Sequence, residues 1–89
     1  MANTRSAARA ARVNERRRRR NRAVKTRVRR LQKAYLEALS SGDRKAAEEA
    51  LRAYTSAVDK AVQAGVIPWR RAARAKSRLS TRLSTLAAA

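Results

Sequence analysis

The chain has 89 residues, of which 24 are lysine or arginine and 6 are acidic, so its formal net charge is +18. A chain of this length forms at most one domain with a small core, and the absence of cysteine and histidine excludes disulfides and the usual zinc ligands. Such a basic balance predicts a polyanionic partner, which could be nucleic acid or an anionic membrane surface.

Glycine, proline and aspartate divide the chain into three predicted helices. Gly42 and Gly65 suit the left-handed position that follows a helix, and Asp43 suits an N-cap. Pro68 suits the first turn of a new helix because its φ is fixed and it lacks a donor. Together with apolar residues three or four apart, these signals predict helices at about 4–40, 44–64 and 68–86.

The first predicted helix has a basic half and an apolar half. Residues 1–30 carry a net charge of +12, whereas the apolar stripe comprises Val24, Val28, Leu31, Tyr35 and Leu39. At a rise of ~1.5 Å per residue, this helix is ~55 Å long and each of the other two is ~30 Å long. We therefore expect residues 1–22 to project as a basic arm from a bundle formed by residues 23–86.

A run of five arginines, Arg16 to Arg20, lies within this basic arm. Five successive helical residues point nearly all the way round the axis, so the run favours a partner that surrounds it. Like charges three or four residues apart oppose helix formation, so the arm is expected to fray in the free protein and to order on phosphates. The planar guanidinium pairs with phosphate and stacks on bases, which favours nucleic acid as the partner.

The second predicted helix is electrically neutral, and the third is basic again. Residues 31–66 carry no net charge, and residues 67–89 carry +6. The apolar stripe of the second helix comprises Ala47, Leu51, Tyr54, Val58 and Ala61 or Val62. That of the third comprises Ala72, Ala75 or Lys76, Leu79, Leu83 and Leu86. Three such stripes joined by short turns predict an all-α three-helix bundle with antiparallel neighbours and a long N-terminal helix.

The aromatic side chains and the asparagine in the arginine run have competing interpretations. Tyr35 and Tyr54 are expected in the core, with their hydroxyls at its edge. Trp69 either caps the end of the bundle against Ile67, which we favour, or stacks on an exposed base. Asn21 either bonds a phosphate or sugar, or is a neutral surface position. The carboxylates of the second helix are expected to balance nearby cations on a solvated face.

Several function classes have little support in the sequence. The serines have no histidine to activate them and the carboxylates are scattered, so we expect no enzyme, cofactor, metal site or small-molecule substrate. No secretory signal or spanning segment is expected, and the arm has only Val13 and alanines as an apolar face, which argues against a membrane partner. A nucleoid-type DNA-binding protein remains the alternative because it would share the charge.

The order and spacing of short motifs along nearly the whole chain resemble those of a bacterial ribosomal protein family, S-twenty of the small subunit. The motifs are Met1-Ala2-Asn3, Ser6-Ala7, Asn14-Glu15-Arg16, Arg20-Asn21-Arg22-Ala23-Val24-Lys25, Gly42-Asp43, Ala46-Ala47, Val58-Asp59-Lys60-Ala61, Gly65-Val66-Ile67 and Ala72-Ala73-Arg74-Ala75-Lys76-Ser77-Arg78-Leu79. The chain departs from the family at Pro68-Trp69-Arg70, where His-Lys-Asn is usual.

The resemblance implies a structural protein of the cytoplasmic ribosome that binds 16S ribosomal RNA at the 5′ domain and the long penultimate stem during assembly. Its partners would be this RNA and neighbouring components of the small subunit. The residues expected to contact RNA are Asn3, Arg5, Ser6, Arg9, Arg12, Arg16, Arg17, Arg18, Arg19, Arg20, Asn21, Arg22, Lys25, Arg27, Arg29, Arg70, Arg71, Arg74, Lys76 and Arg78.

Overall fold

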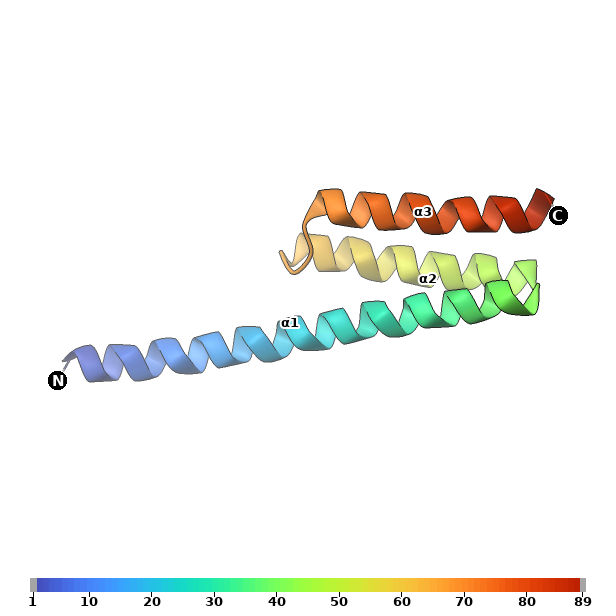
Figure 1. The fold of residues 1–89 in the computed structure, drawn as a ribbon. Coiled ribbons are helices and arrows are strands. Elements are labelled where there is room, and N and C mark those ends of the chain that lie inside the picture. The colour runs from blue at the N-terminus through green and yellow to red at the C-terminus, as the bar shows by residue number, and fades with distance from the viewer. Residues whose placement is uncertain (1, 89) are drawn as a thin grey trace.

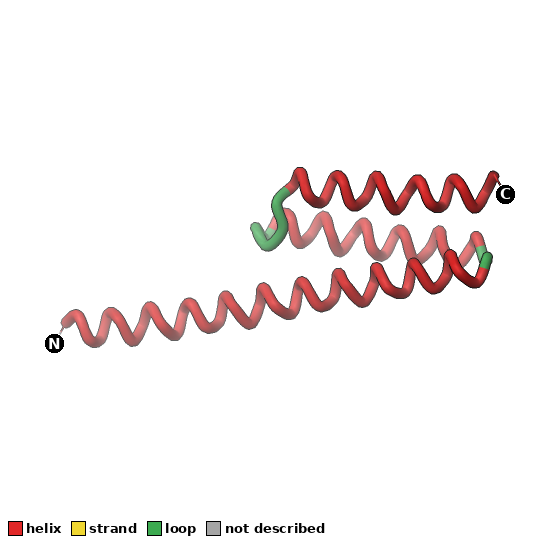
Figure 2. The backbone as a smooth tube through the Cα atoms, viewed as in Figure 1, coloured by secondary structure: helices red, strands yellow, loops and turns green. Residues whose placement is uncertain are grey.

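A computed structural model describes the backbone of residues 2–88 and the side chains of residues 4–86. Over this range the chain forms three helices and no strand, which confirms the all-α three-helix fold class. The helices are α1 (Ala2–Ser41), α2 (Arg44–Gln63) and α3 (Trp69–Ala88). Only two short connections interrupt the helical backbone (Figures 1 and 2).

The first connection reverses the chain between α1 and α2. Gly42 has a φ of +76°, a left-handed conformation that glycine adopts without a steric penalty. Asp43 follows as the N-cap of α2, and its Oδ1 accepts a hydrogen bond from the Ala46 amide at 3.2 Å. These two residues therefore act as the sequence predicts, one ending α1 and the other starting α2.

The second connection ends α2 with a pair of capping hydrogen bonds. The Val66 amide donates to the Ala61 carbonyl at 2.9 Å, and the Gly65 amide donates to the Val62 carbonyl at 3.0 Å, with Gly65 at φ +75°. This is the Schellman pattern, which satisfies carbonyls that have no partner inside the helix. Pro68 lies just before α3 rather than within it, and its carbonyl accepts the first helical bond, from the Ala72 amide.

The middle helix, α2, makes most of the contacts between helices. It packs antiparallel to α1 on one side and to α3 on the other, while α1 and α3 have little direct contact (Figure 1). The molecule measures 68 × 22 × 13 Å, so it is long and thin. The long axis reflects α1, whose N-terminal half extends well past the ends of α2 and α3 (Figure 1).

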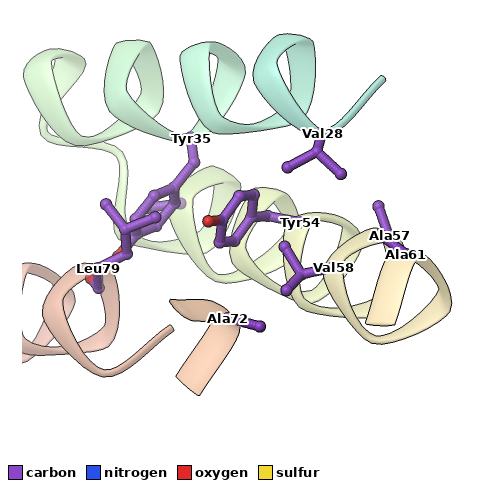
Figure 3. Packing of buried hydrophobic residues seen from close by; sticks show 9 residues of the cluster. Val28, Tyr35, Tyr54, Ala57, Val58, Ala61, Ala72 and Leu79 are labelled. Atoms are coloured by element: carbon purple, nitrogen blue, oxygen red, sulfur yellow. The ribbon is translucent and has the colours of Figure 1, made fainter. Parts of the chain in front are cut away.

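The core lies where the three apolar stripes meet. Its fully buried large side chains are Tyr35 from α1 and Val58 from α2, and Tyr54 and Leu79 lie against them (Figure 3). The Tyr35 hydroxyl donates to the Leu79 carbonyl at 2.5 Å, which links α1 to α3 across the bundle. Burial of both tyrosines was expected, and the Leu79 carbonyl provides the buried Tyr35 hydroxyl with an acceptor.

One expectation about side chains on α2 needs correction. Leu51 of the apolar stripe is partly buried and packs against the core, as its position on the stripe predicts. Asp59 was expected to balance cations of its own helix, but its carboxylate accepts from the Lys76 ammonium of α3 at 2.7 Å. Glu48 does pair within α2, with Arg44 at 3.1 Å. The Asp59 carboxylate therefore links α2 to α3, instead of balancing cations on the solvent-exposed face of α2.

Candidate nucleic-acid interface

The basic arm of α1 presents its side chains to solvent on all sides. Among residues 4–20, every side chain is exposed except Val13, which is partly covered. The apolar residues that pack against the core begin only at Val24. The helix is therefore continuous, but its first half has no packing partner within the described structure (Figure 1).

The charge of the basic arm is almost uncompensated. Glu15 is its one acidic residue, and it contacts Arg19 at 3.2 Å and Arg18 at 3.9 Å. No other arginine of the described arm has a carboxylate within 4 Å. Both contacts are exposed pairs, which contribute little to stability in water. Within the run from Arg16 to Arg20, only Arg18 and Arg19 thus have an acidic partner, and both of these pairs are exposed to solvent.

The expected RNA-contacting residues fall on α1 and on the first half of α3. Those whose side chains are exposed are Arg5, Ser6, Arg9, Arg12, Arg16, Arg17, Arg18, Arg19, Arg20, Arg22, Lys25, Arg27, Arg29, Arg70, Arg71, Arg74 and Arg78. Asn21 and Lys76 are half-buried. Asn3 belongs to α1, but its side chain lies outside the described part of the structure.

A cavity of about 260 Å³ brings the two basic regions of the sequence together. Lys25 and Arg29 of α1 line it from one side, and Arg71 of α3 lines it from the other. It opens where α1 and α3 diverge around α2. Gln32 also lines this cavity, and sequence reasoning missed it because it lies between two apolar residues of the α1 stripe. Gln32 lies one turn after Val28 and so on the same helical face, and this spacing could have identified it.

A second concave surface continues along α1 toward the N-terminus. Asn14, Asn21, Lys25 and Arg29 line it, so it shares two residues with the cavity. The Oδ1 atom of Asn21 is buried there and has no hydrogen-bond partner among the described residues. Sequence reasoning missed Asn14, although its spacing of seven residues from Asn21 places both on one helical face.

Trp69 is the exposed large hydrophobic side chain of the described structure. It is 65% exposed, so it does not cap the bundle, and the packing interpretation is wrong. The Arg70 guanidinium lies over its ring, 5.3 Å from the centroid, in a cation–π arrangement. The partly buried Ile67 packs against the core instead, and the Trp69 indole lies exposed at the start of α3 with Arg70 over its ring.

Among the described residues, no group of three or more histidine, cysteine or acidic residues could hold a metal ion. None of the three helices, over its described length, is long and apolar enough to cross a membrane.

The chain is similar to known proteins over most of its length. Residues 2–84 match the family model of ribosomal protein S20. The small ribosomal subunit protein bS20 of Opitutus terrae is 51% identical over 80 residues, covering 90% of this chain and 93% of the relative. The bS20 of Solidesulfovibrio magneticus is 53% identical over 81 residues, covering 91% of each chain.

A more distant relative matches over a longer stretch. The bS20 of a Mycobacterium species is 44% identical over 86 residues, which is 97% of this chain and 100% of the relative. The match thus includes the basic arm, both capped turns and most of α3. On the family model and these relatives, the chain belongs to the ribosomal protein S20 family.

Proposed function

We propose that this chain, as a structural component of the small ribosomal subunit, binds 16S ribosomal RNA directly through the basic arm and the first half of α3. The RNA regions are the 5′ domain and the long penultimate stem, and the protein keeps these RNA helices packed during assembly. The RNA contacts are those residues of the expected set that lie exposed along α1 and α3.

One observation carries this proposal. Half of a long helix has arginines pointing in every direction, one acidic residue and no protein partner in the described structure. A flat duplex face would leave some of these arginines without a phosphate, whereas a site between RNA helices would use them all. The planar guanidinium also suits paired hydrogen bonds to phosphate.

The experiment is a competition assay at about 0.3 M salt, where nonspecific phosphate contacts weaken steeply. The labelled ligand is a folded 16S 5′-domain RNA, and the competitors are an excess of transfer RNA and of duplex DNA. We expect the complex to survive both competitors, because the arm reads an arrangement of RNA helices. Equal competition by DNA would contradict the proposal and favour a general polyanion-binding protein.

A further inference from the structure

We propose that the cavity between α1 and α3 receives one unpaired nucleotide of the bound RNA, with its base inside the cavity and its phosphate at the basic rim. This inference rests on the proposed function and adds a specific subsite to it. It assigns a role to a part of the bundle that lies outside the basic arm.

The walls of the cavity suit a base. Tyr54 and Val58 of α2 line it and are 2% and 1% exposed, and the partly buried Ile67 lines it as well. At about 260 Å³, the cavity is near the lower limit for small-molecule pockets, so it holds one planar group rather than a larger ligand. RNA-binding proteins commonly take up splayed bases against aromatic and apolar side chains.

The rim of the cavity suits the phosphate that such a base carries. Lys25 and Arg29 lie four residues apart on α1, and Arg71 faces them from α3. All three side chains are exposed, and none has a carboxylate within 4 Å among the described residues. Three cations around an apolar floor complement a nucleotide, which is negative at one end and flat and weakly polar at the other.

Polar atoms at and beside the cavity supply hydrogen-bonding capacity. Gln32 lines the wall, and its amide can both donate to and accept from a base edge. Along the adjoining surface, the buried Asn21 Oδ1 lacks a donor. A buried acceptor without a partner is costly, and rotation of the Asn21 amide toward the surface would let a ribose 2′-hydroxyl of the neighbouring nucleotide donate to it. The strand leaving the cavity would therefore follow α1 toward the basic arm.

The test fills the cavity without changing charge. Ala75 lines the cavity on α3 and is half-buried, so Ala75→Phe places a ring where the base would lie. Ala53→Phe is the matched control, since Ala53 is an exposed helical residue of α2. In the competition assay at about 0.3 M salt, we expect Ala75→Phe to lose about tenfold in affinity for 5′-domain RNA and Ala53→Phe to bind like wild type.

A second readout uses the lack of cysteine in the chain. Single variants Ala75→Cys and Ala53→Cys are alkylated with and without RNA, and we expect RNA to slow the reaction of Ala75→Cys alone. The alkylation measurement tests the inference by itself if Ala75→Phe fails to fold. Unchanged affinity of a folded Ala75→Phe, or unprotected Ala75→Cys, would overturn the inference while RNA binding stands. Failure of the wild-type chain to hold RNA against DNA would instead overturn the proposed function.

Discussion

Tyr35 is the residue that connects the two outer helices. Its side chain is completely buried, and its hydroxyl donates to the Leu79 carbonyl of α3. Tyr54 lies beside it in the core (Figure 3), but the described structure contains no hydrogen bond from its hydroxyl. Both tyrosines are buried, but they stabilise the bundle differently. Tyr35 packs and forms a hydrogen bond, whereas Tyr54 mainly packs.

The difference predicts unequal effects of removing each hydroxyl. We expect Tyr35→Phe to lower the free energy of unfolding by about 1 kcal/mol, because a buried hydrogen bond is lost. Tyr54→Phe should have a smaller effect, since its ring and packing are retained. Chemical denaturation of both variants beside wild type checks this. Equal losses would show that the Tyr35–Leu79 bond does not stabilise the bundle.

Both tyrosines also predict how stability depends on pH. Burial raises the pKa of Tyr35, against the opposing charge of Arg82, and burial raises the pKa of Tyr54. Above about pH 10, the unfolded chain releases tyrosine protons that the folded chain keeps. The free energy of unfolding is therefore highest below this pH and falls as pH rises further. Thermal melts from pH 8 to 11 should show the fall, and Tyr54→Phe should make it shallower.

The structural role of a single residue could be predicted from the sequence where that role depends on the neighbouring backbone. Asp43 and Gly65 could be assigned because capping depends on residues next to them in the chain. Trp69 and Asp59 could not be assigned, because their surroundings come from tertiary structure. Lys76, for example, is close enough to Asp59 to bond only after α3 folds back along α2, 17 residues later.

At the scale of helices, the turn after α2 fixes where α3 begins. Gly65 has a φ of +75°, and a Cβ added there would meet no atom within 4 Å. Any cost of replacing it is therefore backbone strain rather than a clash. The same holds for Gly42 before α2. Both turns thus depend on conformational freedom, not on space.

Gly65→Ala should destabilise the bundle by about 1–2 kcal/mol, the usual cost of a left-handed conformation for a residue with a Cβ. Gly65→Asn should recover part of this loss, because asparagine tolerates that conformation better. Urea denaturation of the two variants provides the comparison. If alanine were tolerated as well as glycine, the capping pattern at the end of α2 would not need the positive φ.

The basic arm of α1 is helical in the structure but has no neighbouring helix to stabilise it. Repulsion between arginines three and four residues apart opposes the helix, and Glu15 offsets only part of it. The arm should therefore fray in the free protein and become ordered on RNA. Hydrogen exchange should be fast over residues 4–20 and slow over 28–39 without RNA, and RNA should slow the first region. Equal protection of both regions in the free protein would contradict this.

For the whole molecule, the sequence predicts the fold class and the two-part nature of α1. Charge and apolar period change together near Val24, and helix lengths show that α2 and α3 cannot cover all of α1. The sequence does not predict that α1 and α3 diverge around α2, because stripe positions do not determine interhelical angles. The cavity, with Gln32 and Ala75 in its wall, follows from that divergence and was therefore missed.

Membership of the S20 family makes this chain a structural protein of the small ribosomal subunit in the bacterial cytoplasm, and not an enzyme. The elongated shape fits such a role. The bundle stabilises the fold, and the projecting half of α1 gives the molecule its length of 68 Å. In the proposed function the two parts of the molecule have separate roles: the basic arm binds RNA and the bundle supplies stability.

The measurement that tests the separation most directly is the salt dependence of binding to 5′-domain RNA, with thermal unfolding measured on the same variants. The arm variant is Arg17→Gln with Arg20→Gln, and the control with the same charge loss is Arg52→Gln with Lys60→Gln on α2. We expect the arm variant alone to lower the slope of log affinity against log salt, by roughly 0.7–0.9 per lost phosphate contact. Its unfolding temperature should be unchanged or higher, because repulsion is relieved. Equal slopes for the two variants, or a destabilised arm variant, would show that RNA binding and stability are not divided between the arm and the bundle.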